Sequence, residues 1–349
     1  MVLAWSHKLT PKQTKAASTI YGQARLEEGV FNKMCQLILS SKAPSTLAIY
    51  CSSIKRWNSY ALSNSYQTFP PNTMHFSLYV THLATKKTPL STFKTLRAAM
   101  PFYYAARNSI ETPVTRIPYV KLLLDGASRE AAKNRGPIKK AATLDQASLR
   151  EVLISSMWPT GSEFSPSRCL KDWRTAVKLY TYYKTLCRFD CYMKLTPCSF
   201  TFEDSHLIIS FTSAKNDQMY NGSVAVLAYT PGDLLCPFLV YKTYFKMMDF
   251  ALNHTENLNC RLTQTGKSRP ITRLSYGTSL SDTKELLTRF GHLANFSEKS
   301  FKSSGVSIIL DKGTPLTDVQ IYGRWASERT PLVYHDSSTA RRASISLLL

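Results

Sequence analysis

The chain has 349 residues, of which 44% are hydrophobic and 11% aromatic, a composition that excludes a mainly disordered protein. No apolar run approaches the roughly 18–20 residues of a membrane-spanning helix, and residues 1–17 lack the apolar stretch of a secretory signal. We therefore expect a protein of about two domains that is not secreted, nuclear if its host is a eukaryote and otherwise cytoplasmic.

The charge is strongly positive and uneven. Lysine and arginine number 44 against 23 acidic residues, which gives a net charge of +21. Residues 1–150 carry 21 basic and 6 acidic side chains, whereas residues 151–349 carry 23 and 17. A surface this basic favours an anionic partner, with nucleic acid first and an anionic membrane surface second. A basic surface that is simply solvated is the alternative.

The eight cysteines contain no CxxC pair, and without an export signal reduced thiols are expected. One set of four residues has side chains of the kind that bind zinc, namely Cys187, Cys191, Cys198 and His206. Its spacing matches no common zinc finger, and several of these positions fall in apolar patterns. We therefore expect no metal site and no other cofactor.

The first half of the chain predicts a basic extension over residues 1–40, followed by a helical bundle over residues 41–133. Ser45 is placed to cap the first helix. Apolar residues then recur at helical spacing, namely Leu47, Tyr50, Cys51, Ile54, Trp57 and Ala61. Further helices are expected over residues 73–85, 91–108 and 120–133. Pro101 lies inside the second of these and should bend or split it.

Residues 134–142, NRGPIKKAA, predict a solvated linker and a weak nuclear-targeting candidate. The second domain follows over residues 143–349, where Thr143 and Gln146 have the spacing of a capping box. Residues 206–212 and 223–229 are rich in β-branched and aromatic side chains and predict two paired strands. Helices are expected up to 157, over 170–186 and 237–250, from 283, around 302–310, from 315 and near 330, with 253–279 irregular.

The familiar nucleotide-binding, metalloprotease and serine-hydrolase motifs are absent, as is the paired acidic cluster of a two-metal nuclease. Five other segments stand out: PSTLAIYCSSIKRW, TLCRFDCYMKL, FTSAKNDQ, KSFKSSGVS and IYGRWASERTPLVY. In this order, over residues 41–334, they resemble the tyrosine recombinase (phage-integrase-like) family, and most of all the members carried by eukaryotic mobile elements. The spacing adds specificity, with 23 residues from Lys302 to Trp325 and 9 from Trp325 to Tyr334.

The resemblance implies a mainly α fold with a small β-sheet. A helical core-binding (SAM-like) bundle and a mixed α/β catalytic domain would form a C-shaped clamp on double-stranded DNA, as a homo-oligomer (dimer or tetramer) and with no membrane partner. It implies a site-specific recombinase or integrase that cleaves and rejoins DNA through a covalent phosphotyrosine, without a cofactor. The basic positions that we assign to DNA binding in the bundle are Lys55, Arg56, Lys94, Arg97 and Arg107.

The resemblance also assigns roles to residues of the second domain. Tyr334 matches the nucleophile, Trp325 a donor to a phosphate oxygen, and Arg188 the first arginine. Lys215 matches the turn lysine that protonates the leaving oxygen, and Lys299 stands at the position of a histidine. A structural interpretation accompanies the first four: a half-buried tyrosine, a core tryptophan, a surface arginine and a hairpin lysine.

Two positions depart from the family. Lys302 replaces the second arginine. A compact ammonium charge on a flexible side chain therefore replaces a planar guanidinium, which can hold two phosphate oxygens at once. Losing one such contact to the transition state costs on the order of 10²–10³ in rate. Cys191 stands where the family has a helping acid, beside Asp190. The alternative is thus a weakened or inactive DNA-binding relative, from a domesticated or decayed element. RNA binding is less favoured, because an RNP aromatic pattern and a GXXG loop are absent.

Overall fold

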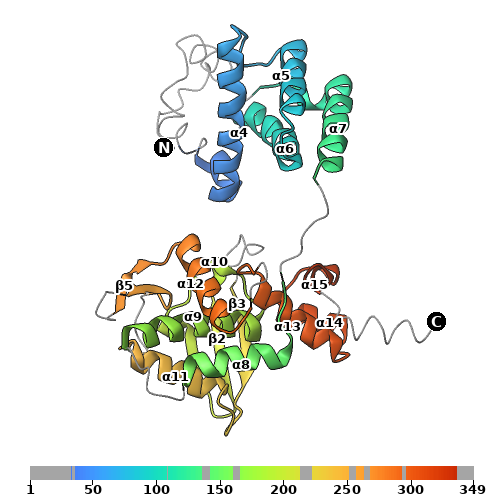
Figure 1. Ribbon diagram of the computed structural model, residues 1–349. Coiled ribbons are helices and arrows are strands. Elements are labelled where there is room, and N and C mark those ends of the chain that lie inside the picture. The colour runs from blue at the N-terminus through green and yellow to red at the C-terminus, as the bar shows by residue number, and fades with distance from the viewer. Residues whose placement is uncertain are drawn as a thin grey trace, which may run out of the picture. The chain divides into compact units, whose positions relative to one another are not determined.

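The computed structural model divides into two compact units, residues 1–139 and 140–349, and each has its own hydrophobic core (Figure 1). The structure describes residues 33, 36–107, 109–135, 142–159, 166–212, 222–250, 257–262, 268–292 and 296–335, with the backbone alone at 166–168 and 268–271. Within these residues, no helix has both the length and the apolar character needed to cross a membrane.

The first unit is a helical bundle. Its helices are α4 (Pro44–Ser63), α5 (Thr73–Thr85), α6 (Leu90–Ala106) and α7 (Pro118–Lys133), with a short 3-10 turn at Val114–Arg116. The predicted stripe of α4 turns inward, and Trp57 is fully buried at its centre. Edge-to-face contacts join the Trp57 ring to Phe76 at 5.2 Å and to Tyr79 at 5.4 Å. Aromatic packing therefore supplies much of this small core.

The structure contradicts the predicted cap of α4 and one of the two effects expected of Pro101, the split. Helix α4 begins at Pro44 with Ala43 at the cap position, and Ser45 does not cap it. Proline suits the first helical turn because an N–H there has no partner within the helix. Helix α6 is continuous through Pro101, so the proline does not split it.

The second unit is mainly helical with a small sheet, as predicted. Its helices are α8 (Gln146–Met157), α9 (Pro166–Thr185), α10 (Phe189–Tyr192), α11 (Pro237–Met247), α12 (Tyr276–Arg289), α13 (Ser300–Asp311), α14 (Leu316–Tyr322) and α15 (Arg329–Tyr334). Its strands are β1 (Phe200–Phe202), β2 (His206–Phe211), β3 (Ser223–Ala228), β4 (Cys260–Leu262) and β5 (Ser268–Arg273). Strands β1, β2 and β3 form one antiparallel sheet in that order, and β4 pairs with β5.

Three expectations about this unit need correction. Within the stretch 253–279, which was expected to be irregular, Cys260–Leu262 and Ser268–Arg273 form the hairpin of β4 and β5. Helix α12 starts at Tyr276 instead of Thr283, with the Ser275 hydroxyl accepting from the Thr278 N–H. Asp145, and not Thr143, caps α8 by accepting from the Ser148 N–H at 2.9 Å.

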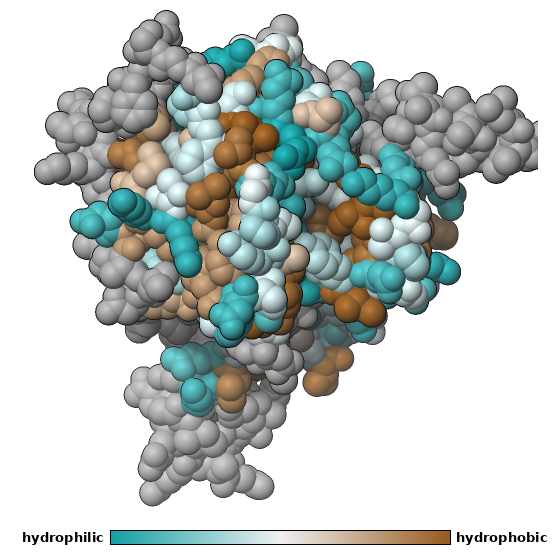
Figure 2. All heavy atoms as spheres, turned by 90° about the horizontal axis from the view of Figure 1, so that it is seen from below, coloured by the Kyte–Doolittle hydropathy of each residue, from teal (hydrophilic) through white to brown (hydrophobic). Residues whose placement is uncertain are grey.

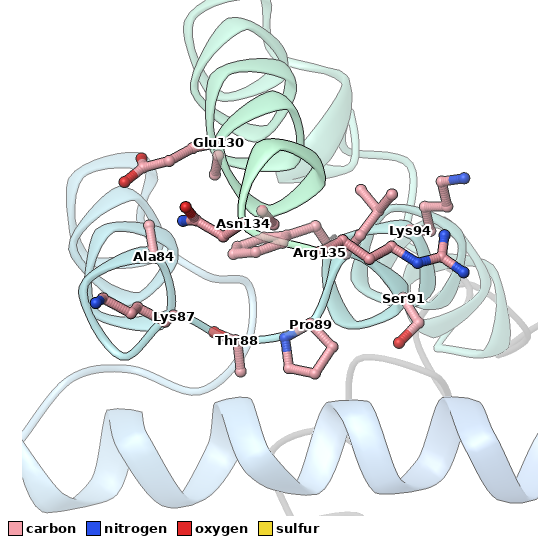
Figure 3. A pocket seen from close by; sticks show the side chains of 13 residues that line it. Ala84, Lys87, Thr88, Pro89, Ser91, Lys94, Glu130, Asn134 and Arg135 are labelled. Atoms are coloured by element: carbon pink, nitrogen blue, oxygen red, sulfur yellow. The ribbon is translucent and has the colours of Figure 1, made fainter. Parts of the chain in front are cut away.

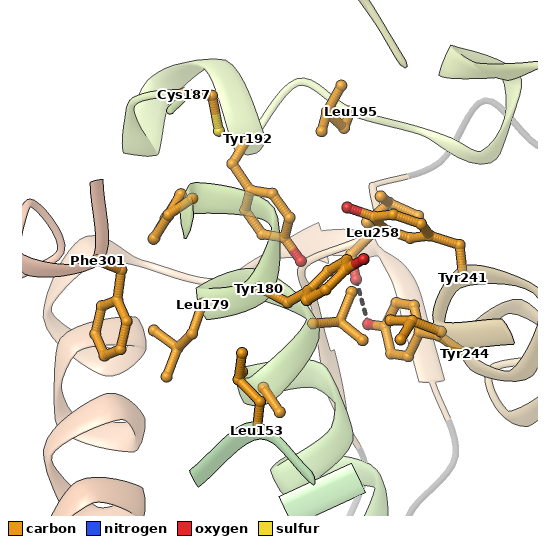
Figure 4. Close-up of a cluster of buried hydrophobic side chains, with 14 of the residues drawn as sticks. Leu153, Leu179, Tyr180, Cys187, Tyr192, Leu195, Tyr241, Tyr244, Leu258 and Phe301 are labelled. Carbon is orange, nitrogen blue, oxygen red and sulfur yellow. Dashed lines mark hydrogen bonds between the residues drawn. The ribbon is translucent and has the colours of Figure 1, made fainter. Parts of the chain in front are cut away.

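Helix α9 runs through the middle of the second unit and is buried on most sides (Figure 1). Tyrosines from α9, α10 and α11 meet around it, as Figure 4 shows for Tyr180, Tyr192, Tyr241 and Tyr244. Their hydroxyls mostly find partners, such as the Leu258 carbonyl that accepts from Tyr244 at 2.7 Å. The rigid core thus fixes the end of α9. At the surface, hydrophobic and hydrophilic residues are mixed on the face in Figure 2.

Candidate active site

Helix α13 packs against the end of α9, and a glycine permits the close approach. A Cβ at Gly305 would lie 2.7 Å from both the Leu186 Cδ2 and the Tyr183 carbonyl oxygen, so no other residue fits without a shift. Lys302 lies one helical turn before Gly305 and therefore shares its face. The packing brings Lys302 within electrostatic reach of Arg188, which follows α9.

Lys302 is enclosed by two aromatic rings, and only 3% of it is exposed. Its Nζ lies 4.5 Å from the centre of the Trp325 ring and 4.7 Å from that of the Tyr334 ring. The two rings are stacked, with centres 5.7 Å apart and planes inclined by 20°. Burial first, and then the positive charge of Arg188, lower the pKa of Lys302 to about 7. Near neutral pH this lysine is consequently only partly charged.

Trp325 packs tightly over the turn before it. A Cβ on Gly323 would fall 2.1 Å from a carbon of the indole, so glycine leaves the room that the ring occupies. Within the described residues, the buried indole N–H of Trp325 has no hydrogen-bond partner. An unpaired buried donor costs free energy, and a bound acceptor at this place would remove that cost.

Tyr334 lies at the end of α15, half-buried against a small cluster around Leu186, Val306, Val319 and Trp325. The residue after it is fixed as well, since His335 Nε2 lies 3.1 Å from Asp311 Oδ1 at the end of α13. Helices α13, α14 and α15 lie side by side (Figure 1). The segment that carries Tyr334 is thereby held against the segment that carries Lys302.

The other predicted residues of the site are placed differently. Arg188 is partly exposed at the start of α10. Lys299 is exposed, one turn before Lys302, and the structure gives no contact between its ammonium group and the cluster. The preceding residue, Glu298, is anchored to Lys178 of α9 by a buried ion pair of 2.9 Å. Lys215 lies outside the described residues. The structure thus brings together Arg188, Lys302, Trp325 and Tyr334.

Sequence reasoning missed Arg324, although it stands beside Trp325 in the GRW motif. Its guanidinium donates to the Thr185 carbonyl at 2.6 Å and to the Tyr322 carbonyl at 3.2 Å. The Cζ lies 4.7 Å from the centre of the Phe211 ring. Its charge also acts on Lys302, whose pKa it lowers further. Arg324 therefore belongs to the same group of cations as Arg188 and Lys302.

No protein-family model matches this sequence. No curated protein matches it either. Solved structures do: the XerH site-specific recombinase bound to its palindromic difH substrate superimposes with a TM-score of 0.56 at 15% identity, over 84% of this chain and 75% of that one. The chain has the tyrosine recombinase fold. The predicted fold is confirmed.

Two further solved structures are similar to this chain. The Tn1549 transposon integrase in complex with transposon right-end DNA is 12% identical, with a TM-score of 0.49 over 95% of this chain and 97% of that one. A lambda integrase dimer bound to a core site is 12% identical, with a TM-score of 0.47 over 88% and 95%. At these identities the likeness to tyrosine recombinases concerns the fold.

In the helical bundle of this tyrosine recombinase fold, the five predicted DNA-binding residues differ in their surroundings. Lys55, Arg56 and Lys94 are exposed. Arg97 pairs with a carboxylate, that of Asp125, at 2.8 Å, and Arg107 lies over the rings of two aromatic side chains. Three of the five predicted residues are thus open to a partner, whereas the other two also serve the packing of the bundle.

Lys94 also lines a pocket of about 440 Å³ between α5, α6 and α7 (Figure 3). Lys87 and Arg135 contribute to the same lining, and Glu130 is its acidic member. Part of the excess positive charge of residues 1–150 therefore lines this pocket, where it would attract anions.

Proposed function

We propose that this protein cleaves and rejoins DNA strands at specific sites through a covalent phosphotyrosine. The observation that carries the proposal is the cluster of Arg188, Lys302, Trp325 and Tyr334 within a tyrosine recombinase fold. Three segments far apart in sequence supply these side chains. They combine a hydroxyl nucleophile, positive charge and an unpaired N–H donor, which is the set that attack on a phosphodiester requires.

In the proposed step, the Tyr334 oxygen attacks phosphorus and releases its proton to solvent. The bond from phosphorus to the 5′ oxygen breaks, and the 3′ phosphate stays on the tyrosine. By resemblance, Lys215 gives the leaving 5′ oxygen its proton. Attack by a 5′ hydroxyl on the phosphotyrosine reverses these changes, so strands are rejoined without an external energy source.

We propose double-stranded DNA as the partner and a homo-oligomer as the active form. Exchange between two duplexes breaks four strands, and each chain offers one candidate nucleophile, so this reaction would need a tetramer. A dimer would supply the two nucleophiles for the two strands of one duplex. Because phosphate contacts release counterions, binding should weaken steeply as salt rises. A binding constant that hardly changes with salt would contradict an electrostatic clamp.

The deciding experiment uses nicked suicide DNA substrates, which trap the covalent intermediate, followed by a denaturing gel. Wild type should form an adduct of protein and DNA, and Tyr334→Phe should form none. Tyr119→Phe is the matched control, since Tyr119 is an exposed tyrosine of α7, and it should react like wild type. An adduct that persists in Tyr334→Phe would show that another residue is the nucleophile.

A specific observation favours the second candidate, a DNA-binding relative without turnover. Lys302, at the position of the second arginine, is enclosed under aromatic rings, and Cys191 at the acid position is buried. Both departures weaken the hold on a phosphate. Salt-sensitive DNA binding together with the absence of any adduct from wild type would select this candidate.

A further inference from the structure

We propose that Arg324 is a catalytic residue, which supplies the second guanidinium that holds the scissile phosphate. The inference rests on the function proposed above, because it adds a residue to the same site. In sequence, the loss of the second arginine at position 302 leaves Arg188 as the one forked cation. In the structure, a second fork reaches the site from the segment between α14 and α15.

The contacts of Arg324 place it where the motif segments converge. It donates to Thr185, three residues before Arg188, and it stacks on Phe211, four residues before Lys215. It precedes Trp325 in the chain, and its charge acts on Lys302. One guanidinium thus lies among the segments that supply Arg188, Lys302 and Trp325.

The hydrogen bonds of Arg324 leave donors available. A guanidinium has five N–H groups, and within the described residues two of them are bonded, both to backbone carbonyls. Bonds to a rigid backbone fix the plane of the fork in advance. Preorganised donors of this kind stabilise developing charge most, because they need no rearrangement during the reaction.

The positive charges around Arg324 favour the binding of an anion. The charges of Arg188 and Arg324 both act on Lys302, and in the described part of the chain none of the three is paired with a carboxylate. The nearby thiol does not supply one, since burial raises the pKa of Cys187 to about 11. Several cations kept together without a counterion are costly, and a phosphate would offset that cost.

The backbone conformation of Arg324 supports the same inference. Its φ is +56°, in the left-handed region that residues other than glycine seldom adopt. Such a conformation is unfavourable and persists where the surrounding structure requires it, often at functional sites. Here it accompanies the turn that sends the Arg324 side chain towards Thr185 and the Trp325 ring over Gly323.

The test must separate contact with the phosphate from support of the fold. It compares wild type, Arg324→Lys and the control Arg329→Lys, an exposed arginine of the same segment, on two suicide substrates. One substrate has a native scissile phosphate and the other a methylphosphonate, in which a methyl group replaces a charged oxygen. The readout is the rate of covalent adduct formation.

With native DNA, Arg324→Lys should slow adduct formation by about 10²-fold, the usual loss for one such donor, and Arg329→Lys by less than about twofold. With the methylphosphonate, the loss for Arg324→Lys should shrink to less than about threefold, because the charge that the fork stabilises is gone. An equal loss on both substrates would show that Arg324 acts through the fold and would overturn the inference, as would no loss on either.

A second measurement keeps the inference apart from the proposed function. If wild type forms no adduct, the proposed function fails, and the phosphate site is judged by inorganic phosphate alone. Phosphate should raise the thermal midpoint of wild type and Arg329→Gln equally, and that of Arg324→Gln by less than half as much. Equal shifts in all three proteins would overturn the inference.

Discussion

The ammonium group of Lys302 lies 4.5 Å from the centre of the Trp325 ring, in a site where only 3% of the lysine is exposed. A cation over an aromatic face gains about 2 kcal/mol when both are desolvated, which offsets part of the cost of burial. The remainder appears as a lowered pKa. The segment that carries Trp325 and Tyr334 thus covers a lysine whose pKa is about 7.

The first prediction concerns stability against pH. The pKa of Lys302 falls from 10.5 to about 7, so between these values the unfolded chain binds more protons than the folded one. Stability should therefore rise with pH from about 7 to about 10 relative to Lys302→Met, which has no such proton. Chemical denaturation of both proteins across this range measures the difference, and a difference that is constant with pH would contradict the burial of a titrating lysine.

The second prediction concerns the unpaired indole. Trp325→Phe keeps a ring beside Lys302 and Tyr334 but removes the N–H, so the fold should persist while adduct formation falls by about 10²-fold. Trp158→Phe is the contrasting variant, because its indole donates to the Leu234 carbonyl at 3.1 Å. That change should lower the melting temperature and leave the adduct rate of the folded protein unchanged. If Trp325→Phe reacts at the wild-type rate, the indole is a core residue alone.

The third prediction concerns the buried ion pair behind α13. Lys178 and Glu298 are each 2% exposed, and Ser279 and Thr283 also bond to the lysine. Glu298→Gln leaves a buried ammonium without its counterion, which should cost about 3–5 kcal/mol of unfolding free energy. Adduct formation should fall with it, because Glu298 holds the start of the helix that carries Lys302.

The control for this pair is Glu285→Gln. Glu285 is 57% exposed in the side chain and accepts from Lys171 at 2.6 Å, in an ion pair that joins α12 to α9. Because an exposed ion pair contributes about 0–1 kcal/mol, this variant should unfold nearly as wild type does. Similar losses in the two variants, measured by urea denaturation, would show that burial does not decide the energetics here.

Much of the first unit could be predicted from its sequence, since helical periodicity is a local property. The stripe that ends in Ile54, Trp57 and Ala61 identified the buried face of α4 before its partners were known. Helix starts were less predictable, because Ala43 and Asp145 occupy caps that neighbouring serine or threonine residues could equally have taken. The hairpin of β4 and β5 was missed because its strands are short and lack a regular apolar alternation.

The parts of the candidate site that depend on spacing along the chain could be predicted from the sequence. The parts that depend on how distant segments pack together could not. The distance along the chain from Lys302 through Trp325 to Tyr334 indicated one cluster, and the three side chains do meet. Arg324 escaped notice because its contacts, Thr185 and Phe211, lie more than a hundred residues away in sequence. The pKa of Lys302 was likewise inaccessible, since it depends on which rings cover the ammonium group.

The last prediction concerns Lys302→Arg, which restores the residue that the family has at this position. From sequence, the planar fork should speed adduct formation while DNA affinity stays nearly unchanged. The structure makes the gain depend on pH, because arginine stays charged whereas the pKa of Lys302 is about 7. With DNA below saturation, the rate follows groups of the free protein. The advantage of Lys302→Arg should therefore grow about tenfold from pH 6 to pH 8, as the charged fraction of the lysine falls. Tyr334→Phe in the same background should give no adduct at either pH. An advantage that does not vary with pH would mean that the charge of Lys302 does not limit the reaction, and that the geometry of the fork alone decides the rate.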